Sequence, residues 1–141
     1  MPGTGKKFDV SLVTPEGSVY EDQAELIIVP GQIGEIGVLA RHAPLIATLK
    51  AGRLRIYPGG NAEVLQFATG PGFFQVLHDR AIALVDDAVD ARHIDLDRAR
   101  RQLEEAQAEL EAIDSGSSTA DRWQAEQRLR HAENQLTVSG Q

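Results

Sequence analysis

The chain has 141 residues, 42% of them hydrophobic and 25% charged, which is typical of a folded protein with one full core and a small appendage. It contains no cysteine, which excludes disulfides, thiolate zinc sites and cysteine nucleophiles. Its net charge of −7 disfavours a surface for nucleic acid or anionic lipid. The apolar runs are too short to cross a bilayer, and no apolar signal region follows Met1–Lys7. We therefore expect a cytoplasmic protein that meets a membrane only through another protein.

Residues 8–85 contain short segments rich in β-branched and aromatic residues, separated by Gly, Pro, Asn and Asp. In the first segment Phe8, Val10 and Leu12 alternate with polar residues, so that one face of the strand is buried and the other is solvated. This alternation is typical of antiparallel sheets. The remaining expected strands include residues 18–20, 24–29, 34–39, 45–49, 53–56, 63–68, 73–77 and 81–85. About nine or ten short strands predict a β-sandwich or flattened barrel.

Beyond Asp90 the hydrophobic period changes, and apolar residues recur three and four positions apart, which indicates an amphipathic helix. Asp95 stands at the position of an N-cap. A short polar segment, residues 114–118, ends this helix. The apolar stripe consists of Leu96, Ala99, Leu103, Ala106, Leu110 and Ile113.

A second helix is expected over residues 119–136, because Ser118 precedes Asp121 by three positions in an arrangement like a capping box. Its apolar stripe has the same spacing as that of the first helix. The stripe consists of Ala125, Leu129, Ala132 and Leu136. Two such helices joined by a short loop predict an antiparallel helical hairpin.

The expected domain organisation has three parts: an N-terminal tail (residues 1–7), a β-sandwich domain (residues 8–90) and a helical hairpin (residues 91–141). Roughly half of the hairpin's apolar stripe is alanine, so its contacts are shallow. Ordering the hairpin costs about as much free energy as those contacts return. We therefore expect the hairpin to depend on packing against the sandwich, a ligand or a partner, as a movable element does.

The sequence offers little evidence of catalytic chemistry. The glycine-rich segment at residues 31–37 is not followed by Lys-Ser or Lys-Thr or by a helix, so its glycines are interpreted as serving tight turns and close backbone approach. The four histidines lack metal-ligand spacing, and no serine stands in a Gly-x-Ser-x-Gly elbow. We therefore predict no catalytic residues and no metal site.

Five acidic residues lie where the sandwich meets the helices. They could bind calcium or act as paired catalytic carboxylates, but their spacing fits no calcium loop. Solvated linker charge and favourable interaction with a helix N-terminus account for most of them. These residues are Asp86, Asp87, Asp90, Asp95 and Asp97.

Residues 34–46, GEIGVLARHAPLI, resemble the Gly-Glu-x-Gly and His-Ala-Pro-Leu signature of ATP synthase epsilon subunits. The similarity is collinear over nearly the whole chain. It includes the opening strand at Asp9, the Gly70-Pro71-Gly72 turn and the helical tail. The family usually has Gly-Gly at that turn, which is a small departure.

The resemblance implies a non-catalytic subunit at the cytoplasmic face of the bacterial plasma membrane. Its ten-stranded sandwich would bind the gamma subunit and the c-ring at the foot of the central stalk. Glu35 matches the family's acidic position that faces the c-ring loops, and His42 lies close to the same surface. The family's helices inhibit ATP hydrolysis by rising along gamma into the catalytic alpha/beta hexamer.

Residues 94–99, IDLDRA, resemble the Ile/Leu-Asp-x-x-Arg-Ala motif with which some epsilon subunits bind regulatory ATP. Asp95 and Arg98 match the motif, and an arginine fork at a helix N-terminus suits phosphate. Helix capping explains Asp95 equally well. On the second helix Arg130 and His131 are basic. No cofactor is otherwise required.

A free-standing β-sandwich binding module with a helical dimerisation tail is the alternative. Such a module needs an exposed aromatic platform. The chain has seven aromatic residues, and Trp123, its one tryptophan, lies on the tail. The sequence therefore favours the rotor subunit.

Overall fold

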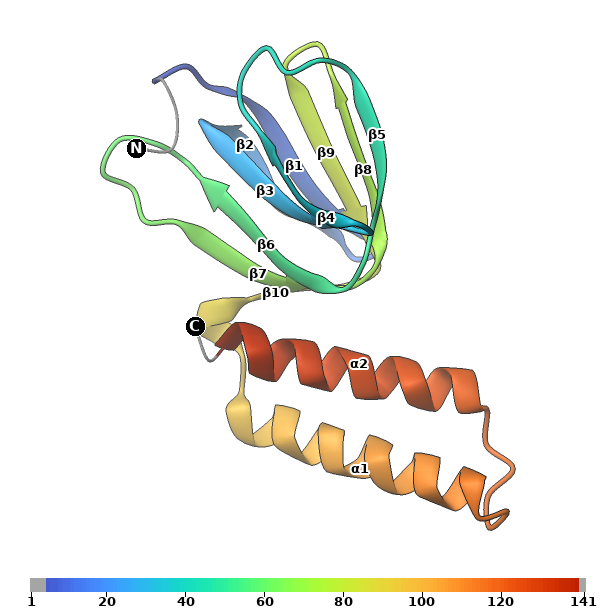
Figure 1. Ribbon diagram of the computed structural model, residues 1–141. Coiled ribbons are helices and arrows are strands. Elements are labelled where there is room, and N and C mark those ends of the chain that lie inside the picture. Colours follow the sequence, from blue (N-terminus) through green and yellow to red (C-terminus); the bar gives the residue numbers. More distant parts are fainter. Residues whose placement is uncertain (1–4, 140–141) are drawn as a thin grey trace.

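The computed structural model describes residues 5–139 as a β-sandwich followed by two α-helices (Figure 1). The strands are β1 (Phe8–Thr14), β2 (Gly17–Ala24), β3 (Leu26–Gly31), β4 (Gly34–Val38), β5 (Leu45–Leu49), β6 (Gly52–Tyr57), β7 (Leu65–Thr69), β8 (Gly72–Leu77), β9 (Arg80–Val85) and β10 (Ala88–Asp90). A 3₁₀ turn, η1 (Ala91–His93), leads into α1 (Leu96–Asp114) and α2 (Arg122–Ser139). The predicted fold class is confirmed. Residues 1–4 of the predicted tail and residues 140–141 of the hairpin lie outside the described residues.

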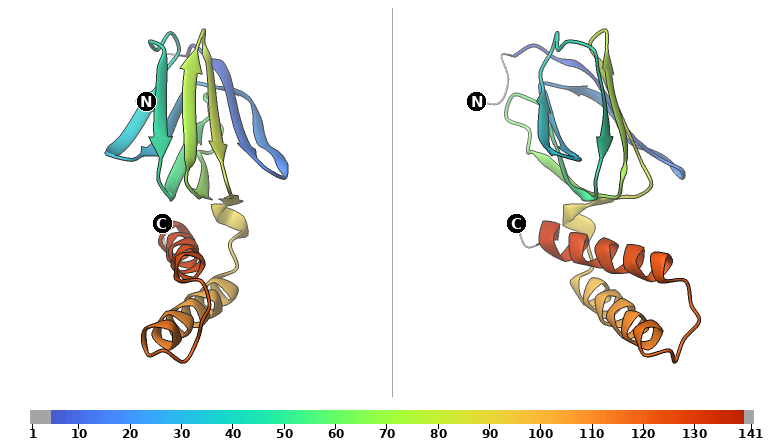
Figure 2. Two further views of the ribbon diagram at one scale, coloured as in Figure 1. Left: turned by 90° about the vertical axis from the view of Figure 1, so that its right-hand side faces the viewer. Right: turned by 45° about the vertical axis from the view of Figure 1, so that its right-hand side comes forward.

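The strands form two layers that are joined along one side. Hydrogen-bonded neighbours follow the order β10-β7-β6-β3-β5-β8-β9-β1-β2, and β4 pairs with β3. The joint between the layers is narrow, because β3 meets β5 only where Gly31 pairs with Leu49. Figure 2 shows β5, β8 and β9 side by side in one layer, with the hairpin below the sandwich. The core between the layers is made by alternate residues of each strand, as the period of two predicts.

The core is entirely closed to solvent at its centre. Its largest fully buried side chains come from seven different strands. They are Phe74, Leu12, Ile27, Leu49, Leu54, Ile56, Val10, Val29 and Val38, together with Thr69. These strands therefore form a single domain, and the helices add no large side chain to its core.

One strand pair differs from the antiparallel arrangement that the alternation predicts. β1 pairs with β9 in parallel, with Val10 opposite Ala81 and Leu12 opposite Ala83. Parallel neighbours cannot be joined by a tight hairpin, and here the whole of the intervening sandwich connects them. The Asp9 amide donates to the Asp79 carbonyl at 3.0 Å and extends this contact to the β8–β9 turn.

A tenth strand, β10, was not among the individually predicted segments. Its three residues pair with β7, where Val89 lies opposite Ala68. The strand is too short to show an alternation of apolar and polar residues, so only its pairing with a distant strand identifies it.

The predicted strand at residues 24–29 is displaced in the structure. Glu25 separates β2 from β3, and the latter continues to Gly31.

The glycine-rich segment forms the β3–β4 hairpin and holds no helix start. A Cβ at Gly31 would lie 2.6 Å from the Gly34 carbonyl oxygen, which confirms the predicted role in close backbone approach. Gly72, the first residue of β8, approaches β9 more closely still, because a Cβ there would lie 1.9 Å from the Leu84 carbonyl oxygen. Within residues 5–139, neither helix is apolar enough to cross a membrane.

Candidate partner-binding surfaces and the helical hairpin

Glu35, the predicted c-ring contact, is the second residue of the edge strand β4. Both of its carboxylate oxygens accept hydrogen bonds from Arg55 Nη2, at 2.9 and 2.8 Å. Arg55 reaches it from β6 across β3, because Pro30 pairs with Glu35 and Ile28 pairs with Arg55. The Glu35 side chain is still 59% exposed. Glu35 can therefore contact a partner, but its negative charge is already paired with Arg55.

His42 lies in the loop that follows β4, at the opposite end of the strand from Glu35. Its Nδ1 is 2.7 Å from the Ala43 carbonyl oxygen. The preceding residue, Arg41, adopts a left-handed backbone with φ of 66°, and its amide donates to a carboxylate oxygen of Asp79. That bond fixes the loop to the β8–β9 turn. The two predicted contact residues therefore lie at opposite ends of β4, Glu35 within the strand and His42 in the loop beyond it.

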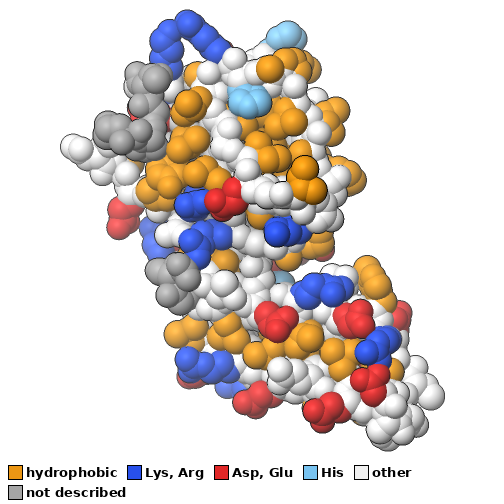
Figure 3. Space-filling model, in the orientation of Figure 1, with side chains coloured by type: hydrophobic (Ala, Val, Ile, Leu, Met, Phe, Trp, Pro, Cys, Tyr) orange, Lys and Arg blue, Asp and Glu red, His pale blue; other side chains and the backbone are white. Residues whose placement is uncertain are grey.

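An uncovered apolar face lies on the outside of β5, β8 and β9. Its most exposed members are Ile46 at 76% and Phe73 at 61%. Phe73 lies between Thr48 of β5 and Leu84 of β9, and Leu77 continues the same side of β8. Figure 3 shows hydrophobic side chains gathered over the sandwich, whereas charged side chains are denser over the hairpin. We call Ile46, Phe73, Leu77 and Leu84 the outer apolar face.

This face was not predicted from the sequence, although two signals for it are present there. Alternation predicts polar residues on the solvated side of a strand, yet β8 carries Phe73 directly before Phe74, and β5 carries Leu45 directly before Ile46. Consecutive apolar residues in a strand place an apolar side chain on both faces. In an otherwise alternating sheet, that pattern indicates a surface for a partner.

Asp95 caps α1, as predicted. Its Oδ1 accepts a hydrogen bond from the Arg98 amide at 3.1 Å, and its backbone has the extended conformation of an N-cap. The Arg98 side chain is exposed. The structure therefore brings the two motif residues together through the Arg98 backbone, and the guanidinium extends into solvent.

The other acidic residues at the junction are accounted for by capping and linker charge. Asp90 caps η1, and its carboxylate accepts from Arg92 Nη2 at 2.7 Å. This hydrogen bond lowers the pKa of the Asp90 carboxyl below its ordinary value. Partial burial raises the pKa of the Asp86 carboxyl, and the adjacent Asp87 charge raises it further. Among the described residues no group of acidic and histidine side chains is arranged to hold a metal ion.

A cavity of about 650 Å³ separates the base of the sandwich from the hairpin. The sandwich contributes Lys50, Asp86 and Asp87, and α2 contributes Arg130 and His131. Neither Asp95 nor Arg98 lines it. The basic residues of α2 and the motif of α1 therefore do not share this cavity.

The two helices pack through alanine. The fully buried residues of α1 are Ala99 and Ala106, and α2 buries Ala125 and Ala132. The larger residues of the predicted stripes are only partly buried, and Leu96 is 42% exposed. Each alanine removes little apolar surface from water, so the hairpin interface is weak for its length. The predicted shallow packing is confirmed.

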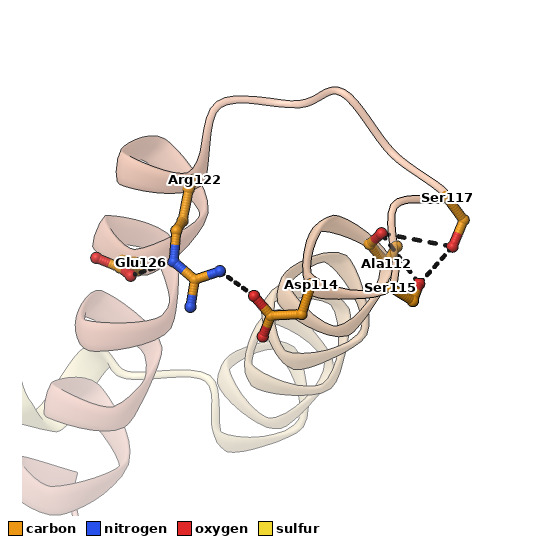
Figure 4. A network of polar contacts seen from close by, with 6 residues as sticks. All are labelled: Ala112, Asp114, Ser115, Ser117, Arg122 and Glu126. Carbon is orange, nitrogen blue, oxygen red and sulfur yellow. Dashed lines mark hydrogen bonds and ion pairs between the residues drawn. The ribbon is translucent and has the colours of Figure 1, made fainter.

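Polar contacts close the hairpin at its loop (Figure 4). Arg122 donates to Asp114 across the loop and to Glu126 Oε1 of its own helix at 3.0 Å. Ser115 and Ser117 both donate to the Ala112 carbonyl, at 3.2 and 3.4 Å. These groups are exposed, so solvent screening leaves each ion pair with only a small contribution to stability.

The second helix begins later than predicted. Asp121, not Ser118, caps it, and its Oδ1 accepts from the Trp123 amide at 2.9 Å. The Ser118 hydroxyl instead accepts from the Ala120 amide at 3.1 Å, within the loop. Both residues suit an N-cap, and the one nearer to the packed stripe occupies that position.

Two family models together match residues 7–140 of the chain. The β-sandwich domain of the ATP synthase delta/epsilon chain matches residues 7–91, and its long α-helix domain matches residues 92–140. The chain belongs to the ATP synthase delta/epsilon chain family. The resemblance drawn from residues 34–46 is thereby confirmed.

Bacterial epsilon chains are similar over nearly the whole chain. The ATP synthase epsilon chain of Bacillus mycoides (strain KBAB4) is 36% identical over 134 residues, 95% of this chain and 97% of the relative. That of Desulfitobacterium hafniense (strain Y51) is 36% identical over 137 residues, 95% of this chain and 100% of the relative.

Solved structures share the fold. A chain of the Euglena gracilis mitochondrial ATP synthase, OSCP/F1/c-ring in rotational state 1, superposes with a TM-score of 0.78 at 24% identity, covering 96% of this chain and 85% of that chain. A chain of the Tetrahymena thermophila mitochondrial ATP synthase central stalk and c-ring gives a TM-score of 0.58 at 14% identity, covering 95% and 97%. The fold of this chain is therefore also found in these two solved structures.

The alanine interface predicts that Ala106→Leu destabilises the hairpin by about 1–3 kcal/mol, because the added side chain overpacks a site that is 2% exposed. Ala108→Leu on the exposed side of the same helix is the matched control. Thermal melting followed by the helical circular dichroism signal measures both. Equal melting of the two variants would contradict the alanine packing.

Proposed function

We propose that this protein is a non-catalytic rotor subunit that couples proton-driven rotation of the c-ring to ATP synthesis and restrains ATP hydrolysis with its helices. The observation that carries the proposal is the match of both family domains, in order, over the described chain. A sandwich with an uncovered apolar face and a weakly packed hairpin are the two physical features that such a role requires. The subunit would act at the cytoplasmic face of the bacterial plasma membrane as a peripheral component.

The outer apolar face is the surface proposed to bind the gamma subunit. Ile46 and Phe73 project from a sheet whose other face is already filled by the core. Removing such side chains from water stabilises a complex, and exposed aromatic anchors are typical of binding hot spots. A rotor component also needs a rigid contact, and β-strand side chains provide one.

Contact with the c-ring is proposed for the surface that carries Glu35 and His42. The Arg55 partner of Glu35 makes this surface nearly neutral at β4. A polar c-ring loop would therefore meet a fixed pair of opposite charges, which gives orientation more than affinity.

The hairpin is proposed to inhibit hydrolysis by leaving the sandwich and extending into the catalytic alpha/beta hexamer. Its alanine interface and exposed ion pairs make the docked state weak, so a partner surface can compete for the helices. The 19 residues of α1 and the 18 of α2 correspond to lengths of about 27 Å each, enough to reach along a stalk.

Regulatory ATP is proposed to bind at the α1 N-terminus through Asp95 and Arg98. The free Arg98 guanidinium suits a phosphate group, and the helix dipole adds favourable field. Because Asp95 already accepts from the Arg98 amide, ATP would add to the cap without replacing it.

The gamma proposal predicts that Phe73→Glu weakens binding of the chain to purified gamma about thirtyfold or more, which corresponds to the loss of a hot spot. The outward side chain leaves the core untouched, so the melting temperature stays nearly constant. Titration calorimetry measures the binding.

Val64→Glu is the matched control, since Val64 is 39% exposed and lies outside the outer apolar face. If both variants bind gamma like the unmodified chain, the outer apolar face is not the gamma surface.

The regulatory proposal predicts that deletion of residues 91–141 raises ATP hydrolysis by the reconstituted complex and leaves synthesis nearly intact. The sandwich retains its complete core and both proposed contact surfaces, whereas the inhibitory helices are gone. Unchanged hydrolysis would refute an inhibitory tail.

The nucleotide proposal predicts that Arg98→Ala reduces ATP binding by the isolated chain about tenfold or more, through loss of a charge-assisted contact. Arg101→Ala, one turn further along α1 and also exposed, is the control. Equal affinities for the two variants would leave Asp95 as a helix cap alone.

A further inference from the structure

The hairpin is attached to the sandwich by one face of one helix. α1 packs mainly on α2, and α2 in turn packs on β6, β7 and η1. The face of α2 that meets the sandwich carries His131, Asn134 and Val138, at spacings of three and four. This face is distinct from the predicted stripe that faces α1. α2 therefore has two interfaces, and release of the second one frees the whole hairpin.

Asn134 lies at the centre of the docking face. Its Nδ2 donates to the Gly52 carbonyl at 3.2 Å and to the Thr69 carbonyl at 3.1 Å. Gly52 and Thr69 are register partners at the end of the β6–β7 ladder, so a single carboxamide joins two strands to α2. Thr69 is fully buried, and its hydroxyl donates to the same Gly52 carbonyl at 3.4 Å, so Asn134 joins an existing polar contact at the end of the ladder.

The neighbouring contacts are less decisive. His131 Nδ1 lies 3.2 Å from Asp87 Oδ2, but both side chains are more than a third exposed and the pair is charged only when the imidazole is protonated. Val138 is 2% exposed, but its apolar packing does not fix the orientation of the helix as a hydrogen bond does. Only Asn134 gives the docked helix a fixed position through two bonds to main-chain atoms, which sequence changes in the sandwich cannot remove.

We infer that Asn134 is the latch of the hairpin: its two hydrogen bonds to the Gly52 and Thr69 carbonyls set the equilibrium between docked and released helices. The inference deepens the proposed regulatory function and rests on it for the consequence in the complex. The latch itself is a property of the isolated chain. Its bonds are neutral and directional, so they fix the position of the helix while adding only a modest net free energy to the docked state.

Two variants separate the latch from other effects. Asn134→Leu has nearly the same size and a higher helix propensity, so it removes both donors while the helix is preserved. Asn134→Asp replaces the donor by a carboxylate that faces two carbonyl oxygens. Glu133→Leu and Glu133→Asp are matched controls, because Glu133 is exposed on the same turn of α2.

The full chain contains no cysteine, so Asn61→Cys and Ser117→Cys at two exposed positions allow specific labelling for energy transfer between sandwich and hairpin loop. We expect the ratio of released to docked chain to rise about tenfold for Asn134→Leu and further for Asn134→Asp. The Glu133 variants should match the unmodified chain. Equal energy transfer in the Asn134 and Glu133 variants would overturn the latch.

The same variants in the reconstituted complex test the regulatory role separately. Stronger inhibition of ATP hydrolysis by Asn134→Leu would support both the latch and the inhibitory tail. A change in energy transfer without a change in hydrolysis would keep the latch and refute the tail's proposed function. Unchanged energy transfer refutes the latch whatever the hydrolysis rate.

Discussion

Docking of α2 on the end of the β6–β7 ladder is the interaction on which the arrangement of this chain depends. The hairpin buries alanine between its helices and cannot gain much free energy from its own interface. The sandwich, by contrast, closes its core without the helices. The chain thus combines a stable sandwich with a hairpin of marginal stability. The contact between the two determines where the hairpin lies.

This division separates fixed surfaces from movable ones. Glu35 and the outer apolar face belong to strands whose opposite sides are buried, so they would keep their positions if the hairpin were released as proposed. The α1 N-terminus follows directly after β10 and η1, close to the hinge of any such movement. A ligand bound there would act where a small change in backbone direction displaces the whole hairpin.

Much of this architecture could be predicted from hydrophobic period and capping alone. The alternation at Phe8, Val10 and Leu12 marks real core positions, and Asp95 caps the helix it was expected to cap. What escaped prediction depends on contacts between distant residues. β10 exists because β7 pairs with it, and Asn134 matters because two carbonyls 82 and 65 residues away lie within its reach. The residues adjacent to β10 and Asn134 in the sequence do not indicate these long-range contacts.

Three of the residues that match the family's motifs already have local partners in the isolated chain. Glu35 pairs with Arg55, His42 contacts the Ala43 carbonyl, and Asp95 caps its own helix. A partner that engages these groups must exchange an existing bond for a new one, so each contact adds less net free energy than its geometry suggests. The outer apolar face, by contrast, leaves Ile46 and Phe73 exposed. On the proposed assignment, affinity for the rotor comes from this face, and the motif residues set the orientation in which the subunit is held.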